Sequence, residues 1–278
     1  MAQKTAIVVG AGVFGCVIAA TLRDLGISVQ VFDDRRPMDG STPSGFLMKP
    51  SWITMMPKED LEDGFALLDR LYGITDIQLK MWPLKKMVTA HHLSRQAVLY
   101  PPNMVFRRKS VIGINFQDHT VVVAHNPVEE YADYIVIAAG VWTNDIFGLE
   151  IPGLYGKRGI SFIYKGVIKP FIKPWAPYKQ VVAHQHDKPG EFWVGDGTAI
   201  KTENWTIQRQ RQTQNRVMRA IGPRYDSPVI QHGIRSFVKD SKPCYFKKIA
   251  RRTWTVAGGG KNGTIAAAWA ANRLAREL

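Results

Sequence analysis

The 278-residue sequence has only two cysteines, Cys16 and Cys244, and they lack the close spacing of a zinc site or a disulfide framework. We therefore expect two free thiols in a reducing compartment. No apolar run reaches the length of a membrane-spanning helix, and no signal peptide precedes the first predicted strand. These absences predict a soluble protein of the cytoplasm (the host cytoplasm if the protein is viral) with no membrane partner.

Acidic residues are scarce. The 23 Asp and Glu residues stand against 37 Lys and Arg residues, which gives a formal net charge of +14. A field of this sign attracts polyanions, so it favours contact with nucleic acid, although a solvated basic surface has the same composition. The basic residues gather in five clusters, at residues 35–36, 85–86, 107–109, 247–248 and 251–252.

Internal repeats, low-complexity segments and a clear linker are also absent, so we expect a second domain to be woven into a nucleotide-binding one. The strongest pattern occupies residues 5–34. A short apolar run predicts a buried parallel strand, a glycine-rich turn follows, and apolar residues at three- and four-residue spacing predict a helix. A second buried strand follows the helix and ends at Asp33.

Each glycine of this turn has a physical role. Gly10 allows the tight turn, Gly12 lets a pyrophosphate approach the backbone, and Gly15 lets the helix pack closely on the strand. Asp33 follows Gly15 by 18 residues, near the place where a carboxylate meets a ribose hydroxyl. The pattern therefore predicts a bound dinucleotide. An acid at the ribose favours FAD or NAD over NADP, and the turn alone does not choose between those two.

The rest of the chain predicts a mixture of helices and strands. Pro57 is typical of a first helical turn, and the following apolar residues predict a helix that ends near Gly73. Residues 74–90 predict irregular strands, and adjacent His91 and His92 are a poor metal pair. A polar helix is expected to begin at an N-cap and to stop at Gly222. We take Thr202 as that N-cap. A final helix is expected at the C-terminus. The expected strands are residues 111–116, 121–124, 134–138, 159–165, 179–186, 191–194, 229–238 and 252–257.

Four stretches together resemble a known family. They are residues 10–33, 40–47 and 138–142, and the C-terminal Gly233-Ile234-Arg235 with residues 239–243 and 258–264. In this order they resemble the FAD-dependent D-amino-acid oxidase superfamily, most closely its glycine oxidase branch. The resemblance selects FAD over NAD. Cys244 does not match the cysteine that some relatives link to the flavin, so non-covalent FAD is implied.

The resemblance implies an α/β (α+β) fold. A Rossmann-like FAD-binding domain of the D-amino-acid oxidase and glutathione reductase type would be interwoven with an antiparallel-sheet substrate domain. We expect a discontinuous FAD-binding domain, and we assign residues 1–50, 105–158 and 229–278 to it and residues 51–104 and 159–228 to the substrate domain.

The resemblance also implies roles for individual residues. Arg235 falls where the family's arginine binds the substrate carboxylate, and Lys261 falls where glycine oxidases carry a second basic residue. Lys49 is a candidate for stabilising superoxide charge during reoxidation. The family's active-site tyrosine has no clear counterpart, and His184 and His186 are the polar residues of its strand. The residues expected to contact FAD are Gly10, Gly12, Phe14, Gly15, Asp33, Asp34, Ser41, Thr42, Ala139, Gly140, Trp142, Gly260, Asn262, Gly263 and Thr264.

Three functional hypotheses remain open. The first is an oxidase of a glycine-type amine attached to a nucleobase, because the chain resembles the oxidase half of the enzyme that trims carboxymethylaminomethyl-uridine in tRNA. It also resembles the flavin oxidases with which some bacteriophages hypermodify thymidine, which favours DNA over tRNA. The product set would be glyoxylate, hydrogen peroxide and an aminomethyl group, with molecular oxygen as acceptor. We expect Trp52 and Trp82 to stack an extruded base.

The second hypothesis is a free glycine, sarcosine or D-amino-acid oxidase whose charge is incidental. The third is a flavin-bearing nucleic-acid-binding subunit without turnover. Arg235 within its motif argues against the third, because a subunit without substrate needs no carboxylate-binding arginine. No metal is expected in any of the three.

Overall fold

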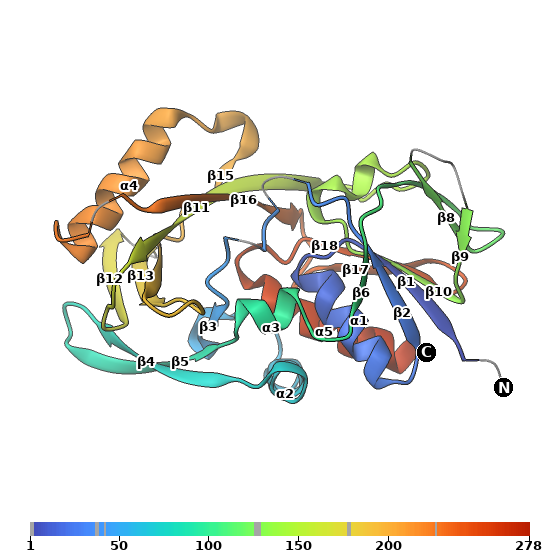
Figure 1. Ribbon diagram of the computed structural model, residues 1–278, viewed down its shortest axis with the longest axis horizontal. Helices are drawn as coiled ribbons and strands as arrows, with labels where there is room; N and C mark the ends of the chain where they lie inside the picture. Colours follow the sequence, from blue (N-terminus) through green and yellow to red (C-terminus); the bar gives the residue numbers. More distant parts are fainter. Residues whose placement is uncertain (1–2, 37–38, 42, 125–128, 177–178, 226) are drawn as a thin grey trace.

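The computed structural model describes residues 3–36, 39–41, 43–124, 129–176, 179–225 and 227–278 (Figure 1). Its first sheet has the strand order β17-β18-β10-β1-β2-β6. All neighbours in it run parallel except β17, which pairs antiparallel with β18 at the edge. The strands are β1 (Thr5–Val9), β2 (Ser28–Phe32), β6 (Val105–Arg107), β10 (Tyr134–Ile137), β17 (Tyr245–Ala250) and β18 (Thr253–Ala257).

Other elements cover both faces of this parallel sheet. Both faces of its central strands are therefore buried, which explains why their sequences are near-continuous apolar runs. On one face lie α1 (Val13–Asp24), α2 (Lys58–Tyr72) and α5 (Gly263–Glu277), whose apolar residues share a core with the strands. The alanines of α5 are buried there, and their small side chains let helix and sheet approach closely. The opposite face packs against a small antiparallel sheet made of β7 (Val111–Asn115), β8 (Thr120–Val123) and β9 (Glu129–Tyr131).

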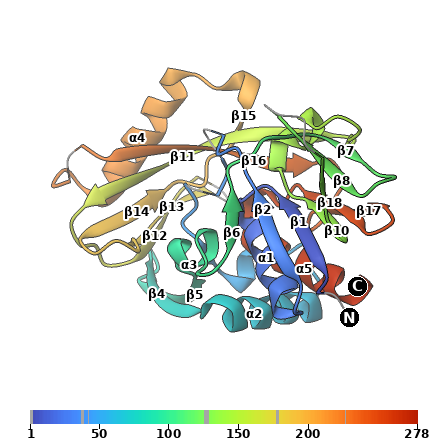
Figure 2. The ribbon, with the colours of Figure 1, turned by 45° about the vertical axis from the view of Figure 1, so that its right-hand side comes forward.

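A larger sheet of nine strands forms the other half of the molecule (Figures 1 and 2). Its order is β15-β11-β14-β13-β12-β4-β5-β3, with β16 paired to β11. The helix α4 (Ile207–Ile221) packs its buried residues on this sheet, and the short α3 (Arg95–Leu99) follows β5. The strands are β3 (Leu47–Met48), β4 (Thr75–Met81), β5 (Lys86–His92), β11 (Leu154–Lys165), β12 (Phe171–Ala176), β13 (Lys179–Gln185), β14 (Glu191–Gly195), β15 (Ile200–Lys201) and β16 (Val229–Val238).

The long antiparallel pair of β11 and β16 connects the two halves. It runs along the upper side of the molecule in Figure 1, and its register extends from Leu154↔Val238 to Ile163↔Val229. A bridge between Phe237 and Gly259 joins the end of β16 to the segment that follows β18. This connection brings residues of the larger sheet to the carboxyl end of the parallel sheet, where ligands bind in open α/β folds.

The mixed α/β fold with a Rossmann-like half agrees with the sequence prediction, and several elements agree in detail. Helix α2 begins after Pro57 and ends at Gly73, whose φ of +70° suits glycine. The predicted strand 229–238 is β16. The division into two domains stays a prediction, and β16, assigned to the FAD-binding domain, is hydrogen-bonded into the larger sheet.

Other predictions were wrong. Thr202 does not cap the polar helix: Thr206 does, and its hydroxyl accepts the amide hydrogen of Arg209 at 3.2 Å. Residues 202–204 form a separate single turn of 3₁₀ helix. The segment predicted as irregular strands is a regular hairpin of β4 and β5. Strands β12 and β17 were not expected from their sequences, because β12 contains a proline and β17 contains two adjacent lysines. In the described part of the chain, no helix combines the length and apolar character that crossing a bilayer needs.

Candidate active site

A cavity of about 550 Å³ lies at the carboxyl end of the parallel sheet, beside the end of β16. This volume is within the range of small-molecule and cofactor sites. It extends from the nucleotide motif to the arginine of β16. Its lining comes mainly from residues 9–14, 32–36, 106–109, 138–142, 234–236 and 259–261, together with Ser41, Ser44, Phe46, Gly263 and Thr264.

The glycine-rich turn lies at the first end of this cavity. Gly10 has a φ of +102°, and a Cβ there would lie 2.5 Å from the carbonyl oxygen of Ala138, so only glycine fits. A Cβ on Gly15 would overlap the carbonyl oxygen of Gly10, which explains the close contact of helix and strand. Gly12 is the N-cap of α1 and carries no capping side chain, and the residues that begin the helix line the cavity.

Asp33 follows β2 at the same end. Its carboxylate accepts the amide hydrogens of Ala11 at 2.5 Å and Arg35 at 2.6 Å. The neighbouring Asp34 is bound by Arg36 at 2.7 Å and by the hydroxyl of Ser110 at 3.2 Å. Both acids line the cavity, but only Asp33 is held by backbone groups of the glycine turn, which suits the ribose-binding role predicted for it.

Ser41 and residues 139–142 line the middle of the cavity. The Ser41 hydroxyl accepts the amide hydrogen of Val13 at 2.9 Å and so ties the loop after β2 to the start of α1. Gly140 has a φ of +63°, and a Cβ there would meet open space. The guanidinium of Arg36 lies 5.8 Å from the ring centre of Trp142. The prediction for Thr42 lies outside the described residues.

Arg235 and Lys261 lie at the second end. The side chain of Arg235 is partly buried, and its guanidinium forms no hydrogen bond or ion pair with any described residue. Burial lowers the pKa of its guanidinium, and the carboxylate of Asp196 opposes that shift. The pKa of Lys261 is lowered by burial first and then by the charge of Arg235, so the two cations face the same space. A guanidinium at this position can bind a carboxylate through two parallel hydrogen bonds.

Asp196, which we did not single out from the sequence, is fully buried beside this end. Its carboxylate is bound by the guanidinium of Arg216 at 2.7 Å and by the amide and hydroxyl of Thr198 at 2.8 and 2.7 Å. Arg216 neutralises the charge of Asp196, and no ion pair joins Asp196 to Arg235 in the described structure. No local motif announces it, since Arg216 comes from α4 and packs on Trp175 at 4.3 Å.

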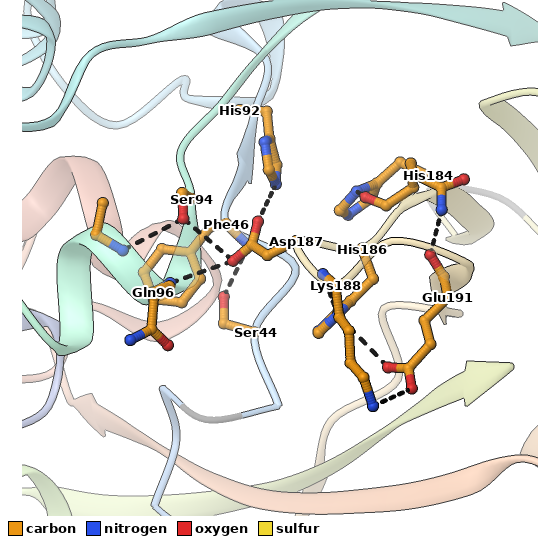
Figure 3. A network of polar contacts seen from close by, with 12 residues as sticks. Ser44, Phe46, His92, Ser94, Gln96, His184, His186, Asp187, Lys188 and Glu191 are labelled. Atoms are coloured by element: carbon orange, nitrogen blue, oxygen red, sulfur yellow. Dashed lines mark hydrogen bonds and ion pairs between the residues drawn. The ribbon is translucent and has the colours of Figure 1, made fainter. Parts of the chain in front are cut away.

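The predicted substrate-binding histidines belong to a separate polar cluster (Figure 3). His184 is 1% exposed, its Nδ1 lies 2.9 Å from the carbonyl oxygen of Gln185, and its Nε2 has no partner among the described residues. Burial, followed by the neighbouring His92, lowers the pKa of His184 to about 3. His186 lies beside Glu191, and burial lowers its pKa as well. Neither histidine is part of the described cavity lining.

Other predicted residues lie beside the cavity or away from it. Lys49 and Asn262 are not in the described lining, although Asn262 is the N-cap of α5 and stands between the lining residues Lys261 and Gly263. Trp82 is at the hairpin of β4 and β5, with Lys80 over its ring at 4.8 Å. The side chain of Trp52 is outside the described part of the structure. Within the described ranges, no group of three or more His, Cys, Asp or Glu side chains could hold a metal ion.

Comparison with known proteins agrees with this geometry. Residues 8–43 match the family model described as an NAD(P)-binding Rossmann-like domain. No curated protein has a sequence that matches this chain significantly.

Solved structures are similar over nearly the whole chain. A glycine oxidase from Bacillus cereus has a TM-score of 0.73 at 13% identity and covers 98% of this chain and 96% of its own. An iminodiacetate oxidase from Chelativorans sp. BNC1 has a TM-score of 0.72 at 14% identity, with 97% and 94% covered. An FAD-dependent oxidoreductase from Pseudomonas aeruginosa has a TM-score of 0.67 at 14% identity, with 100% and 91% covered. At such identities the similarity shows a shared fold.

Proposed function

We propose that this protein is an FAD-dependent oxidase that oxidises the carbon–nitrogen bond of a glycine-type amine. One observation carries the proposal: the cavity that begins at a dinucleotide-binding turn ends at an arginine with no partner among the described residues. The names of similar folds, glycine oxidase and iminodiacetate oxidase, support the same chemistry, because both name amines that carry a carboxylate.

The residues of the cavity fit FAD. The N-terminus of α1, which lines the cavity, suits a pyrophosphate, Asp33 suits a ribose, and the open space beside Gly140 suits a flat ring system close to the backbone. Cys244 is buried, bonds weakly to the carbonyl oxygen of Ala266, and is not in the described lining, which supports non-covalent binding. When bound, FAD would supply the acceptor for the hydride and pass its electrons to oxygen.

The side chains of this chain would bind and orient the amine. Arg235 would bind the carboxylate and thereby fix the carbon that loses the hydride, which is a contribution of orientation. Lys261 would add a second positive charge beside it. The overall reaction balances: the secondary amine, oxygen and water give the shortened amine, glyoxylate and hydrogen peroxide. In that sum two electrons pass from the carbon–nitrogen bond to oxygen.

For the substrate, we favour a glycine-type amine carried on a pyrimidine of DNA, as in oxidation of glycyl-thymidine to aminomethyl-deoxyuridine. The net charge of +14 supports a polyanionic substrate, and the cations at the second end of the cavity support docking there. A tRNA wobble uridine offers the same chemistry. A free glycine, sarcosine or D-amino acid would fit the arginine equally well and leaves the charge without a role.

Two measurements test this proposal. Acid precipitation should release a yellow flavin, and a colourless protein that binds NAD instead would contradict it. Peroxide should then form with an oligonucleotide bearing a glycyl-aminomethyl pyrimidine, with glyoxylate identified by mass spectrometry. Glycine and sarcosine serve as the comparison. Fast turnover of free glycine with no turnover of the oligonucleotide would leave the oxidase and remove the nucleic-acid substrate.

A further inference from the structure

One face of the strands beside the cavity carries an unusual set of side chains. In the antiparallel register Arg235 lies opposite Lys157, and Phe237 lies opposite Tyr155. Lys201 of β15 lies opposite Lys157 on its other side. Directly opposed residues share a face of an antiparallel sheet, so these five side chains lie together (the β-ribbon is visible in Figure 1).

The charges on this face form a row. Arg235, Lys157 and Lys201 follow one another across β16, β11 and β15, each on the neighbouring strand. Like charges directly opposite each other destabilise a sheet, so a row of three is a feature that folding alone does not favour. Lys261 adds a fourth cation: it lines the same cavity as Arg235, and its pKa is lowered first by burial and then by the charges of Arg235, Lys179 and Lys157. An anion bound along the row would relieve this repulsion.

Two stacked aromatic rings lie next to the row. The rings of Tyr155 and Phe237 are 5.6 Å apart and inclined by 22°. The ammonium of Lys157 is 4.8 Å from the centre of the Phe237 ring, and that of Lys201 is 6.0 Å from the Tyr155 ring. Phe237 packs on Gly260, where a Cβ would lie 2.7 Å from the ring, and Gly260 lines the cavity. Tyr155 remains 36% exposed.

Negative charge near this face is limited. Lys201 lies 3.8 Å from Glu203, and both side chains are largely exposed, so this pair contributes little. The buried Asp196 is already bound by Arg216. Lysines beside an exposed aromatic ring are the combination with which proteins bind single-stranded nucleic acid, because phosphates meet the cations and bases stack on the ring. An acidic peptide would use the charges and leave the aromatic pair without a role.

We propose that Tyr155, Lys157, Lys201 and Phe237, here called the lysine–aromatic face, bind the polynucleotide strand next to the reacting nucleotide. The proposal rests on the proposed function for its substrate class. It identifies where the strand lies: phosphates on Lys157 and Lys201 and a base on Tyr155, while the modified base enters the cavity toward Arg235. The stacking role expected for Trp52 and Trp82 is thereby assigned to Tyr155, which stacks on Phe237, the ring that packs on the cavity-lining Gly260.

The test measures binding of a fluorescein-labelled oligothymidylate by anisotropy over a series of salt concentrations. The double variant Lys157→Gln/Lys201→Gln should reduce the magnitude of the log–log salt slope by about 1.4, because each single-strand phosphate contact contributes about 0.7. Tyr155→Leu should weaken binding about 5- to 150-fold with an unchanged slope, since it removes stacking alone. The matched control, Lys85→Gln/Lys86→Gln, removes the same charge from the exposed end of the β4–β5 hairpin.

The outcomes separate this proposal from the proposed function. Equal losses of affinity and equal changes of salt slope in Lys157→Gln/Lys201→Gln and in the control would mean that binding depends only on total charge. That result would overturn the proposed role of the lysine–aromatic face. Displacement of the oligonucleotide by polyglutamate at equal charge would overturn it as well. Flavin content and peroxide formation from sarcosine, measured on the same wild-type preparation, test the oxidase separately. If the oxidase is active but its affinity for the oligonucleotide does not depend on the lysine–aromatic face, the proposed function stands and this docking site is refuted.

Discussion

The two ends of the cavity are built by different means. At the nucleotide end, the contacts come from backbone groups and glycines within residues 10–33, held by a short carboxylate. At the Arg235 end, the contacts come from two long cationic side chains, Arg235 on β16 and Lys261 after β18. Backbone groups are fixed by the fold itself, whereas long side chains can be exchanged without changing it. We therefore expect the first end to set cofactor binding and folding, and the second to set the substrate.

The largest effect should come from Gly15→Ala, which disrupts the nucleotide end of the cavity. The new Cβ would overlap the backbone carbonyl oxygen of Gly10, so helix and strand must move apart, and the loss in the free energy of unfolding should exceed the ~1–3 kcal/mol typical of core overpacking. Little folded, flavin-containing protein should be recovered. In the comparison variant Gly12→Ala, the Cβ would meet only the Ser41 hydroxyl at 3.2 Å. That protein should fold, with a thermal midpoint close to wild type, and lose flavin. Equal loss of folding in both would refute the distinction.

The next largest effect should come from Arg235→Ala at the second end. Removing one partner of a desolvated charge pair costs about 2–5 kcal/mol, so kcat/KM should fall about 30- to 5,000-fold. Flavin content should be unchanged, because Arg235 comes from the larger sheet. Arg235→Lys should recover only part of the loss, since an ammonium cannot bind a carboxylate in the same two-bond geometry. Wild-type efficiency in the alanine variant would show that Arg235 is structural.

The sequence predicts the nucleotide end of the cavity better than the Arg235 end, because only the first is built from residues close together in the chain. The nucleotide end is local: strand, turn, helix and Asp33 lie within about thirty residues and follow fixed spacings. Helix α2 was equally readable, because Pro57 and Gly73 mark its ends. The neighbours of Arg235 depend on which strands pair, and no local pattern reveals that Lys157 lies between it and Lys201. Asp196 escaped notice because its partner Arg216 lies 20 residues away on another element.

A smaller effect should come from Asp33→Asn, which sharpens the role of the first end. Hydrogen bonds to a charged group contribute about 1.5–3 kcal/mol, so the flavin dissociation constant should rise about 10- to 150-fold. Asp34→Asn is the matched comparison, because Asp34 lines the same cavity but is bound by Arg36 and Ser110. Fluorescence titration of the apoprotein with FAD measures both. A larger loss in the Asp34 variant would reverse the assignment of the two acids.

The smallest effect concerns stability at acid pH, and it should arise in the larger sheet. His184 has a pKa lowered to about 3 in the folded protein, from 6.5 in the unfolded chain, because burial and the neighbouring His92 disfavour its charge. Between these two values the unfolded chain binds the proton and the folded protein does not. Stability is therefore complete above about pH 6.5 and declines as the pH falls, with a slope of up to about 1.4 kcal/mol per pH unit for this one group.

The variant His184→Gln isolates this contribution, because it removes the titration while keeping a polar side chain of similar size. Burial also lowers the pKa values of His92 and His186, so the variant should keep part of the acid sensitivity. The free energy of unfolding, measured with denaturant at several pH values between 7 and 5, should change less with pH in the variant than in the wild type. This comparison of slopes holds whatever the absolute stability of the variant. No described histidine lines the cavity, so the affinity for flavin should change less between pH 7 and 5 than the free energy of unfolding does. An unchanged slope in His184→Gln would mean that His184 is charged, and therefore paired or hydrated, in the folded protein.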